Sequence, residues 1–429
     1  MFGTKDHLKV ENGHLKIGGA DTVDLAEKFG TPLYVTDELR LRQNVRAYRE
    51  AFPDAWTYFA VKANGNLAIL TILAQEGMGA DVFSGGELSL ARLAGMPLEK
   101  ILFNGNSKSE AELEMAVDSG ARVSADSLVE VEALSEVAAN RGEVVEVVFR
   151  VNPDVSVETH PKIATGLRTS KFGIPAAEIL DVYKTAMSLD GVRPVGLHCH
   201  IGSQILEISP FAEAMTKMMD LAEKIVEIGG EIEMMDFGGG LGVQYHPDNE
   251  APAPKDLADA ILPIFEGRCK DLGISPKMVL EPGRSIAADT TIMLTKVNTV
   301  KKAHVNFVGV DAGFNLLARP MIYDAYHHAV VANKAGEDPK ETYTVVGPIC
   351  ESGDVLAKER TLPEIERGDL IAMLDAGAYG FSMASVYNGQ PRCAEVLANE
   401  GEVELIRRAE DRSIFLAGQI VPPRILGKR

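Results

Sequence analysis

The chain has 429 residues, of which 46% are hydrophobic and 24% are charged, and its formal net charge is −19. The length favours two domains, and the composition favours a globular protein with a sizeable core. The acidic balance argues against a general nucleic-acid-binding protein and against a protein of anionic membrane surfaces.

The N-terminal sequence and the cysteines indicate the cytoplasm. Residues 1–19 lack the apolar segment of a secretory signal, and no apolar run is long enough to span a bilayer. The cysteines lie far apart and form no CxxC pair, which is typical of free thiols in a reducing compartment. We therefore expect a cytoplasmic protein without a zinc site or a disulfide framework.

The first predicted element is a hairpin around Asn12-Gly13, a sequence that favours a tight turn between two strands. Eight short apolar segments follow, with amphipathic helix-like stretches between them, and each is expected to be a strand: 56–63, 79–84, 100–107, 121–127, 144–153, 194–203, 233–240 and 277–284. Strand and helix alternating eight times predict a (β/α)8 barrel, which we place at residues 32–287.

After about residue 290 the pattern changes to β-branched strands joined by turns, with few helices. We expect residues 288–429 to form a mainly β domain, completed by the N-terminal segment 1–31. Polar residues cluster at the ends of the barrel strands, including Lys62, Asn104 and Glu281. Because active sites of such barrels lie at the C-terminal ends of the strands, this edge is the expected site.

Lys62 ends the apolar run TYFAVKAN, where an unpaired buried ammonium group would be costly. Its stem could simply cover apolar surface with the charge in water. At the mouth of a barrel, however, a partly desolvated lysine has a lowered pKa and can form a Schiff base with a carbonyl compound.

A glycine-rich loop, DFGGGLG at 236–242, follows the seventh predicted strand and contains Gly238, Gly239 and Gly240. It could be only a tight turn, but backbone N–H groups in such loops bind anions, and barrel phosphate sites favour the last two strands. A phosphate site near a reactive lysine suggests pyridoxal phosphate. Glu281, in EPGR at the end of the eighth strand, could then keep the pyridine nitrogen protonated.

The sequence HCHIGS offers a different hypothesis, because His198 and His200 share one face of a strand. Metal-dependent barrel hydrolases use such a pair on their first strand, with further ligands. Here the pair is on the sixth strand and no other histidines complete the set, so no metal site is expected. Stacking of His200 on a flat cofactor fits better.

Seven segments together resemble the diaminopimelate decarboxylases, within the alanine-racemase-like, fold type III group of pyridoxal-phosphate enzymes. They run in the order of that family from residue 57 to 389: YFAVKAN, TGLRTSKFGI, HCHIGSQ, DFGGGLG, EPGR, GPICESGD and DAGAYGFSMASVYNG. One segment, FVGVDAGFNLLARPMIY, departs from the commoner pattern of the family before Arg319, so the conformation of that loop is an open question.

The resemblance implies roles for individual residues. Lys62 would bond to the cofactor aldehyde, His200 would stack on the pyridine ring, and Glu281 would pair with the ring nitrogen. The remaining cofactor contacts would come from Ser203, Gly238, Gly239, Gly240, Pro282, Gly283, Arg284 and Tyr379. Substrate would be bound by Arg284, Arg319, Tyr323, Glu351 and Tyr379. Asp81 and Arg150 match positions near the cofactor.

The implied reaction is decarboxylation of meso-2,6-diaminopimelate to L-lysine, the last step of lysine biosynthesis. Cys350 would protonate the substrate carbon, and Cys350 and Glu351 would come from the second subunit of a head-to-tail homodimer. Three alternatives remain: a related decarboxylase of ornithine, arginine or another basic amino acid, a metal-dependent barrel hydrolase, and a relative that binds without catalysis.

Overall fold

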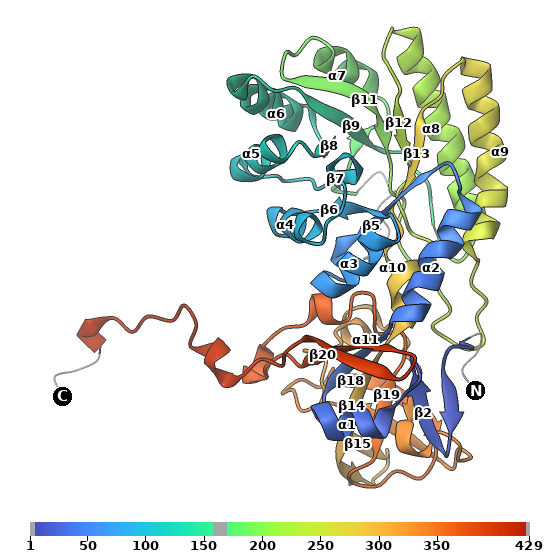
Figure 1. Cartoon of the computed structure of the whole chain (residues 1–429), viewed down its shortest axis with the longest axis vertical. Helices are drawn as coiled ribbons and strands as arrows, with labels where there is room; N and C mark the ends of the chain where they lie inside the picture. Colours follow the sequence, from blue (N-terminus) through green and yellow to red (C-terminus); the bar gives the residue numbers. More distant parts are fainter. Residues whose placement is uncertain (1–4, 158–169, 426–429) are drawn as a thin grey trace.

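The structure is a computed structural model, and it describes residues 5–157 and 170–425. A barrel of strands and helices lies above a β-domain that is built from the N-terminal segment and the C-terminal strands (Figure 1). The predicted motif TGLRTSKFGI begins outside the described residues, and only its part from Ser170 to Ile174 can be placed.

Within the described residues, eight parallel strands close into the predicted barrel, because the last strand pairs with the first and the fourth with the fifth. The strands are β5 (Trp56–Ala60), β6 (Gly79–Val82), β7 (Ile101–Phe103), β8 (Arg122–Ala125), β9 (Val145–Asn152), β11 (Val192–His198), β12 (Met234–Asp236) and β13 (Lys277–Leu280). A short strand, β10 (Ile174–Pro175), extends the pairing of β9. Each of the eight predicted segments overlaps one barrel strand, so the predicted barrel is confirmed.

Helices surround the barrel (Figure 1). They are α2 (Glu38–Ala51), α3 (Leu67–Gln75), α4 (Gly85–Leu93), α5 (Glu110–Ser119), α6 (Leu128–Arg141), α7 (Ile179–Ala186), α8 (Ser209–Glu227) and α9 (Pro254–Leu272). Several begin at a residue whose side chain accepts an orphan backbone N–H, such as Ser84 and Ser127, and several end at a left-handed glycine, such as Gly142. These local signals fix where each helix starts and stops on the barrel.

The barrel has two layers of apolar packing. The interior is filled by a small cluster of strand side chains: Tyr58, Leu102, Val148, Val195, Met234 and Val279. A much larger core lies between the strands and the surrounding helices. The strands are therefore buried on both faces, which explains why they read as continuous apolar runs in the sequence.

The second domain is mainly β, as predicted. Its strands are β4 (Leu33–Asp37), β14 (Thr291–Lys301), β15 (Phe307–Val310), β16 (Ala329–Val331), β17 (Glu341–Val346), β18 (Val355–Leu362), β19 (Leu370–Met373), β20 (Ala394–Asn399) and β21 (Glu402–Arg407). Two short helices, α10 (Arg284–Ala287) and α11 (Arg319–Tyr323), stand at its entry and near the barrel mouth.

The N-terminal segment begins with the predicted hairpin, β1 (Lys9–Glu11) and β2 (His14–Ile17), followed by β3 (Ala20–Asp21) and α1 (Thr22–Phe29). Its contribution to the β-domain extends past the boundary expected at residue 31. β4 pairs antiparallel with β14 and parallel with β20, and all five of its residues are buried. β4 therefore belongs to the sheet of the β-domain and not to the barrel.

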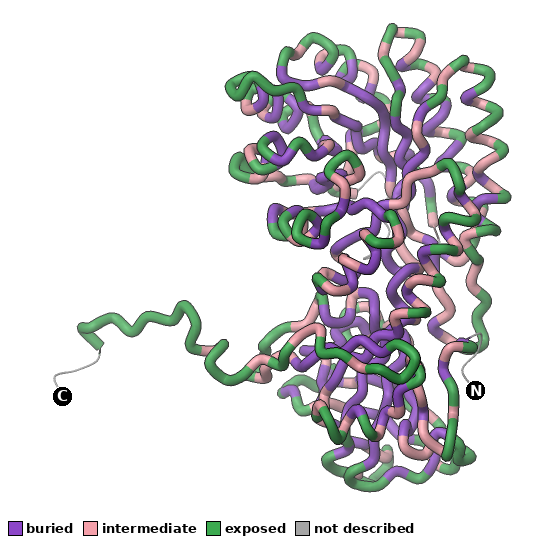
Figure 2. Tube along the Cα trace, in the orientation of Figure 1, coloured by how far each residue is buried: buried purple, intermediate pink, exposed green. Residues whose placement is uncertain are grey.

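Burial follows the two domains, and the C-terminal stretch is the exception (Figure 2). Residues 408–425 leave the β-domain as an extended arm, and most of them are exposed. The helices in the described part of the chain include none that is long and apolar enough to cross a membrane.

Candidate active site

Lys62 lies in a single helical turn, Val61–Ala63, directly after β5 at the barrel mouth. Its Nζ donates a hydrogen bond of 2.5 Å to Oδ2 of Asp81 at the end of β6, and it lies 4.3 Å from the centre of the Phe83 ring. The side chain is 33% exposed, whereas that of Asp81 is fully buried. The amine is therefore held by a buried carboxylate while part of the Lys62 side chain stays exposed.

The pKa of Lys62 differs from the expectation. Burial lowers this pKa, as the sequence suggested, but the Asp81 carboxylate outweighs burial, and Tyr379 and Glu281 add to its effect. The net result is a pKa above the ordinary value of a lysine. The expectation of a lowered pKa was wrong because it considered desolvation without the adjacent carboxylate.

Asp81 and Glu281 are joined by Asn104. The Asn104 side-chain amide donates to Oδ1 of Asp81 at 2.6 Å and to Oε1 of Glu281 at 2.7 Å. Because one amide nitrogen has two N–H groups, it can hold both carboxylates at once. Asp81 lies in β6, and Asn104 and Glu281 directly follow β7 and β13, so the spacing of the three residues is set by the barrel itself.

Glu281 is 4% exposed and stays ionised. Burial raises its pKa, but His198, whose Nε2 lies 3.4 Å from Oε2, and the ammonium group of Lys62 bring the pKa well below its ordinary value. Asp236 behaves in the opposite way, because burial and the nearby Glu281 raise its pKa well above the ordinary value. The barrel core thus lowers the pKa of Glu281 and raises that of Asp236, so that the negative charge is held on Glu281 in preference to Asp236.

The glycine loop passes close to other backbone segments. A Cβ on Gly239 would overlap the carbonyl oxygen of Glu281, and Gly238 and Gly240 have φ angles of 67° and 119°. The N–H of Gly238 donates to Asp236 and that of Gly239 to Nδ1 of His200, so these two donors already have protein partners. Phosphate binding by the loop remains a prediction.

His200 follows β11 and accepts the Gly239 N–H on Nδ1 at 3.2 Å. Burial, Arg150 and Lys62 lower its pKa well below the ordinary value, so the ring is neutral. A neutral, half-buried imidazole held by its edge is suited to stacking on a flat ring.

Ser203 and Arg284, both predicted to contact the cofactor, are brought together. Arg284 donates to Oγ of Ser203 from Nε at 3.2 Å and from Nη2 at 2.9 Å. Its guanidinium also lies 4.8 Å from the ring centre of Tyr379, whose backbone N–H donates to the carbonyl of Ala63 beside Lys62. Tyr379 has a φ of 58°, a left-handed conformation that costs energy in a non-glycine residue.

Arg319 begins α11 and is only 4% exposed, and Tyr323 ends the same helix half-buried. The Arg319 guanidinium lies 4.3 Å from the ring centre of Tyr245, and Arg284 donates to the hydroxyl of the same tyrosine at 2.8 Å. Among the ion pairs of residues 5–157 and 170–425, none includes Arg284 or Arg319. Two buried positive charges without a carboxylate partner form a site for an anion.

Cys350 and Glu351 lie apart from this cluster. Both are exposed on the β-domain, where the Cys350 N–H donates to the Asn388 side chain and Glu351 accepts from the Tyr387 hydroxyl at 2.8 Å. No contact between these two residues and Lys62, Glu281 or Arg319 is found within the described chain. One copy of the chain therefore assembles only part of the predicted site.

Some polar residues at the strand ends have structural tasks instead. Ser84 caps α4, and Asp126 accepts the N–H of Gly173. The HxH pair does not converge, because His198 groups with Asp236 and Glu281 within 4.8 Å while His200 bonds to the glycine loop. The two histidines therefore have different partners and do not form a common metal site within the described residues.

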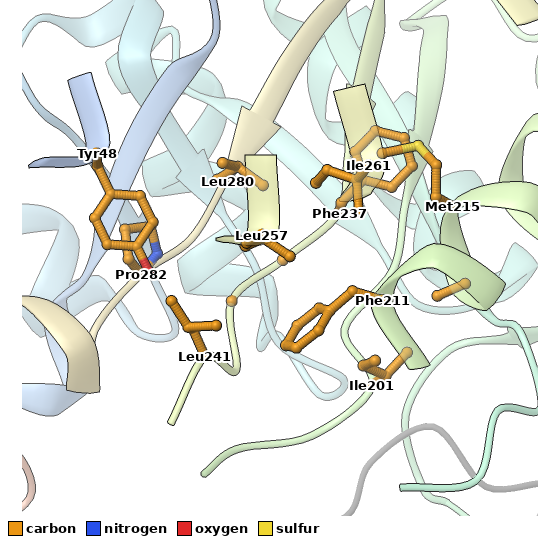
Figure 3. A pocket seen from close by; sticks show the side chains of 13 residues that line it. Tyr48, Ile201, Phe211, Met215, Phe237, Leu241, Leu257, Ile261, Leu280 and Pro282 are labelled. Carbon is orange, nitrogen blue, oxygen red and sulfur yellow. The ribbon is translucent and has the colours of Figure 1, made fainter. Parts of the chain in front are cut away.

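An apolar cavity lies behind the glycine loop (Figure 3). Its lining includes Phe211, Met215, Phe237 and Ile261, but not Lys62, His200 or Glu281. The hydroxyl of Tyr48, which also lines it, is paired with Ser285 at 2.7 Å. Without a titratable group free to react, this cavity is part of the packing that supports the loop and is not the reactive site.

Sequence reasoning missed three residues of the site: Asp236, whose pKa is raised by burial and by Glu281, Tyr245 between the two arginines, and His327, whose Nε2 accepts from Arg319. Asp236 carried a weak signal, since it opens the glycine motif. Tyr245 and His327 carried none, because they lie in irregular segments whose position depends on the whole fold.

The residues present fit pyridoxal phosphate. Lys62 offers an accessible amine, and two buried carboxylates face it with only this one ammonium group between them. The buried negative charge of Glu281 suits a positively charged pyridinium nitrogen.

Residues 38–288 match the family described as "Pyridoxal-dependent decarboxylase, pyridoxal binding domain". The chain is 54% identical to the diaminopimelate decarboxylase of Archaeoglobus fulgidus over 99% of this chain and 100% of that one. It is 46% identical to the diaminopimelate decarboxylase of Methanothermobacter thermautotrophicus over 97% and 98% of the two chains.

Solved structures agree. Diaminopimelate decarboxylase from M. jannaschii, crystallised with L-lysine, superimposes with a TM-score of 0.94 at 42% identity, covering 98% of this chain and 99% of that one. These matches span both domains, so the likeness is not confined to the barrel. The cofactor is pyridoxal phosphate. The family match also rules out the alternative of a metal-dependent barrel hydrolase. The chain belongs to the pyridoxal-phosphate-dependent decarboxylases, in the family of the diaminopimelate decarboxylases.

Proposed function

We propose that this enzyme decarboxylates meso-2,6-diaminopimelate to L-lysine and CO2, the last step of lysine biosynthesis. The observation that carries the proposal is the pair of buried guanidinium groups, Arg284 and Arg319, at the mouth that holds Lys62. The diaminopimelate decarboxylases among its relatives support the same substrate.

The arginine pair distinguishes diaminopimelate from basic amino acids. Diaminopimelate has two carboxylates, one of which leaves as CO2 while the other stays on the product lysine. Ornithine, arginine and lysine have no second carboxylate. A buried positive charge left without an anion is costly, so a site with two unpaired guanidinium groups favours the dicarboxylic substrate.

Lys62 must lose its proton before its amine can attack an aldehyde. Asp81, 2.5 Å away, is the acceptor. Burial and the neighbouring Glu281 raise the pKa of Asp81, which makes its carboxylate a better base than an exposed aspartate. Asn104 keeps this carboxylate in place through its other oxygen.

When bound, pyridoxal phosphate supplies the electron sink that stabilises negative charge at the substrate carbon after CO2 departs. Glu281 would pair with the ring nitrogen and favour its protonated form, and His200 would stack on the ring. Ser203, the glycine loop, Pro282 and Gly283 would hold the phosphate side, and Arg284 would contact both the cofactor and the substrate. Arg319 and Tyr323 bind the carboxylate that remains.

Cys350 and Glu351 come from a second copy of the chain in a head-to-tail homodimer. The Cys350 thiol gives its proton to the substrate carbon, and Glu351 binds the remote amino group. The support is their exposure in a patch with apolar neighbours, Met321 at 42% and Tyr387 at 45%. Apolar side chains around a reactive thiol are expected to be covered by a partner.

We also place the enzyme in the cytoplasm, on the ground that all four cysteines are free. The chain is divided into the N-terminal segment, the barrel and the C-terminal β-domain, with β4 belonging to the β sheet.

The test is CO2 release by the purified holoenzyme with meso-diaminopimelate, ornithine, arginine and lysine in parallel. We expect release from diaminopimelate with a kcat/KM at least about a hundredfold above the others, because the site leaves its arginines unpaired with monocarboxylates. A preference for ornithine or arginine would overturn the substrate while leaving the family intact.

A further inference from the structure

Arg319 is held by a buried histidine. Its Nη1 lies 2.9 Å from Nε2 of His327, and the other ring nitrogen, Nδ1, lies 2.8 Å from the carbonyl oxygen of Leu374. His327 is fully buried. The imidazole thus forms a bridge from the backbone after β19 to the guanidinium.

These two contacts fix the protonation of the ring. A carbonyl oxygen can only accept, so Nδ1 must carry the hydrogen, and the guanidinium can only donate, so Nε2 must offer its lone pair. Burial, together with the charges of Arg319 and Arg284, lowers the pKa of His327 well below its ordinary value, in agreement with a neutral ring.

A neutral acceptor has a consequence that a carboxylate would not have. It fixes the direction of the Arg319 guanidinium without cancelling its positive charge. Tyr245 contributes in the same way, since its ring faces Arg319, lies edge-on to the His327 ring at 5.4 Å, and accepts from Arg284 through its hydroxyl. The charge of Arg319 therefore stays available for an anion.

We propose that His327 is a positioning residue that aims Arg319 at the substrate and so sets the preference for a ligand with a carboxylate remote from the reacting carbon. This inference rests on the proposed function, in which Arg319 binds the carboxylate that stays on lysine. It adds that the selectivity depends on an imidazole that never touches the substrate.

Two ligands isolate that carboxylate. L-Lysine and 1,5-diaminopentane differ only in its presence, so the ratio of their inhibition constants with the holoenzyme measures its contribution. Two variants isolate the hydrogen bond. His327→Gln places a carboxamide oxygen near the position of Nε2 and can still accept from Arg319, whereas His327→Asn reaches only the position of Nδ1 and keeps the bond to Leu374.

We expect His327→Asn to weaken L-lysine about tenfold or more, the range of one charge-assisted hydrogen bond, while 1,5-diaminopentane changes less than about twofold. His327→Gln should stay within about threefold of the wild type for both ligands. Equal weakening of the two ligands, or equal behaviour of the two variants, would overturn the role of His327. If the wild type binds both ligands equally, the proposed function fails first.

A second measurement, of the protonation of the His327 ring by NMR, does not depend on a stable His327→Asn variant. In holoenzyme labelled with ¹⁵N-histidine, the signal of His327 is assigned by its loss in His327→Gln. The inference requires a neutral ring with its hydrogen on Nδ1 at neutral pH. A protonated ring, or one with its hydrogen on Nε2, contradicts the inference, because Nε2 could not then accept from Arg319.

Discussion

The barrel and the β-domain contribute to the proposed site in different ways. In the barrel, Lys62, Asp81, Asn104 and Glu281 form a continuous buried network in which the charges are fixed by hydrogen bonds of 2.5–2.7 Å. On the β-domain, Cys350 and Glu351 stand exposed. The barrel residues of the proposed site contact one another within one chain, whereas Cys350 and Glu351 do not contact them.

This difference follows from what each group must do. Glu281 must remain charged beside a ring nitrogen, and only a rigid interior can hold an ionised carboxylate at fixed geometry without water. A thiol that delivers one proton needs proximity to the substrate but little prearranged charge. Placing it on a surface that a second copy covers lets the mouth stay open until the dimer forms.

The largest expected effect comes from the barrel side. Lys62→Ala removes the amine that is predicted to bond to the cofactor aldehyde, so we expect kcat to fall by about a thousandfold or more. Borohydride reduction of the wild type with cofactor should attach the cofactor covalently to Lys62. Reduction of the variant should attach none. Labelling of another lysine at equal yield would contradict the assignment.

Cys350→Ala tests the β-domain side. Loss of a proton donor should lower kcat about a hundredfold or more, with little change in thermal stability because the side chain is exposed. Cys269→Ala on α9 is the matched control. That thiol is buried away from the mouth, so its loss should reduce stability by about 1 kcal/mol and leave kcat unchanged. The two variants should therefore give opposite patterns.

Two glycine-to-alanine substitutions should have opposite effects on stability, one in the glycine loop and one in a surrounding helix. In Gly239→Ala the new methyl group meets the backbone of Glu281, so we expect a loss of about 2–4 kcal/mol of stability and weaker binding of the cofactor. Gly267→Ala, inside α9 with open space around it, should stabilise by about 1 kcal/mol. Equal melting temperatures for the two variants would contradict the tight approach.

The smallest effect concerns pH and the β-domain. Burial, with the charges of Lys5 and Arg360, lowers the pKa of His328 from 6.5 to about 4. Between these values the unfolded chain binds a proton that the folded chain does not, so stability should fall as the pH falls from 6.5 towards 4. His328→Gln should reduce this slope by up to about one proton. Denaturant unfolding at several pH values measures it, and an unchanged slope would contradict the shift.

Much of this architecture could be predicted from the sequence. The barrel strands were visible because each is an apolar run between helices, and Lys62, His200 and Glu281 because they end such runs. β4 was missed as part of the β sheet, since a five-residue buried strand looks the same in either domain. Its neighbours, β14 and β20, lie more than 250 residues away in the chain.

Electrostatics could be predicted least. The direction of the Lys62 pKa shift depends on a hydrogen bond to Asp81, 19 residues away, and the raised pKa of Asp236 depends on burial and on Glu281. Tyr245 and His327 could not be found at all, because no local pattern marks a residue whose task is to hold an arginine. Such residues are recognised only after the fold has brought their partners together.

A mixture of two inactive variants tests most directly whether each active site is shared between two subunits. Lys62→Ala lacks the barrel side of the site and Cys350→Ala lacks the β-domain side, so a heterodimer of the two would contain one complete site if Cys350 is supplied across the interface. After subunit exchange of equal amounts, we predict recovery of about a quarter of the wild-type decarboxylation of meso-diaminopimelate. Activity that stays at the level of the separate variants, in mixtures shown to contain heterodimers, would contradict it.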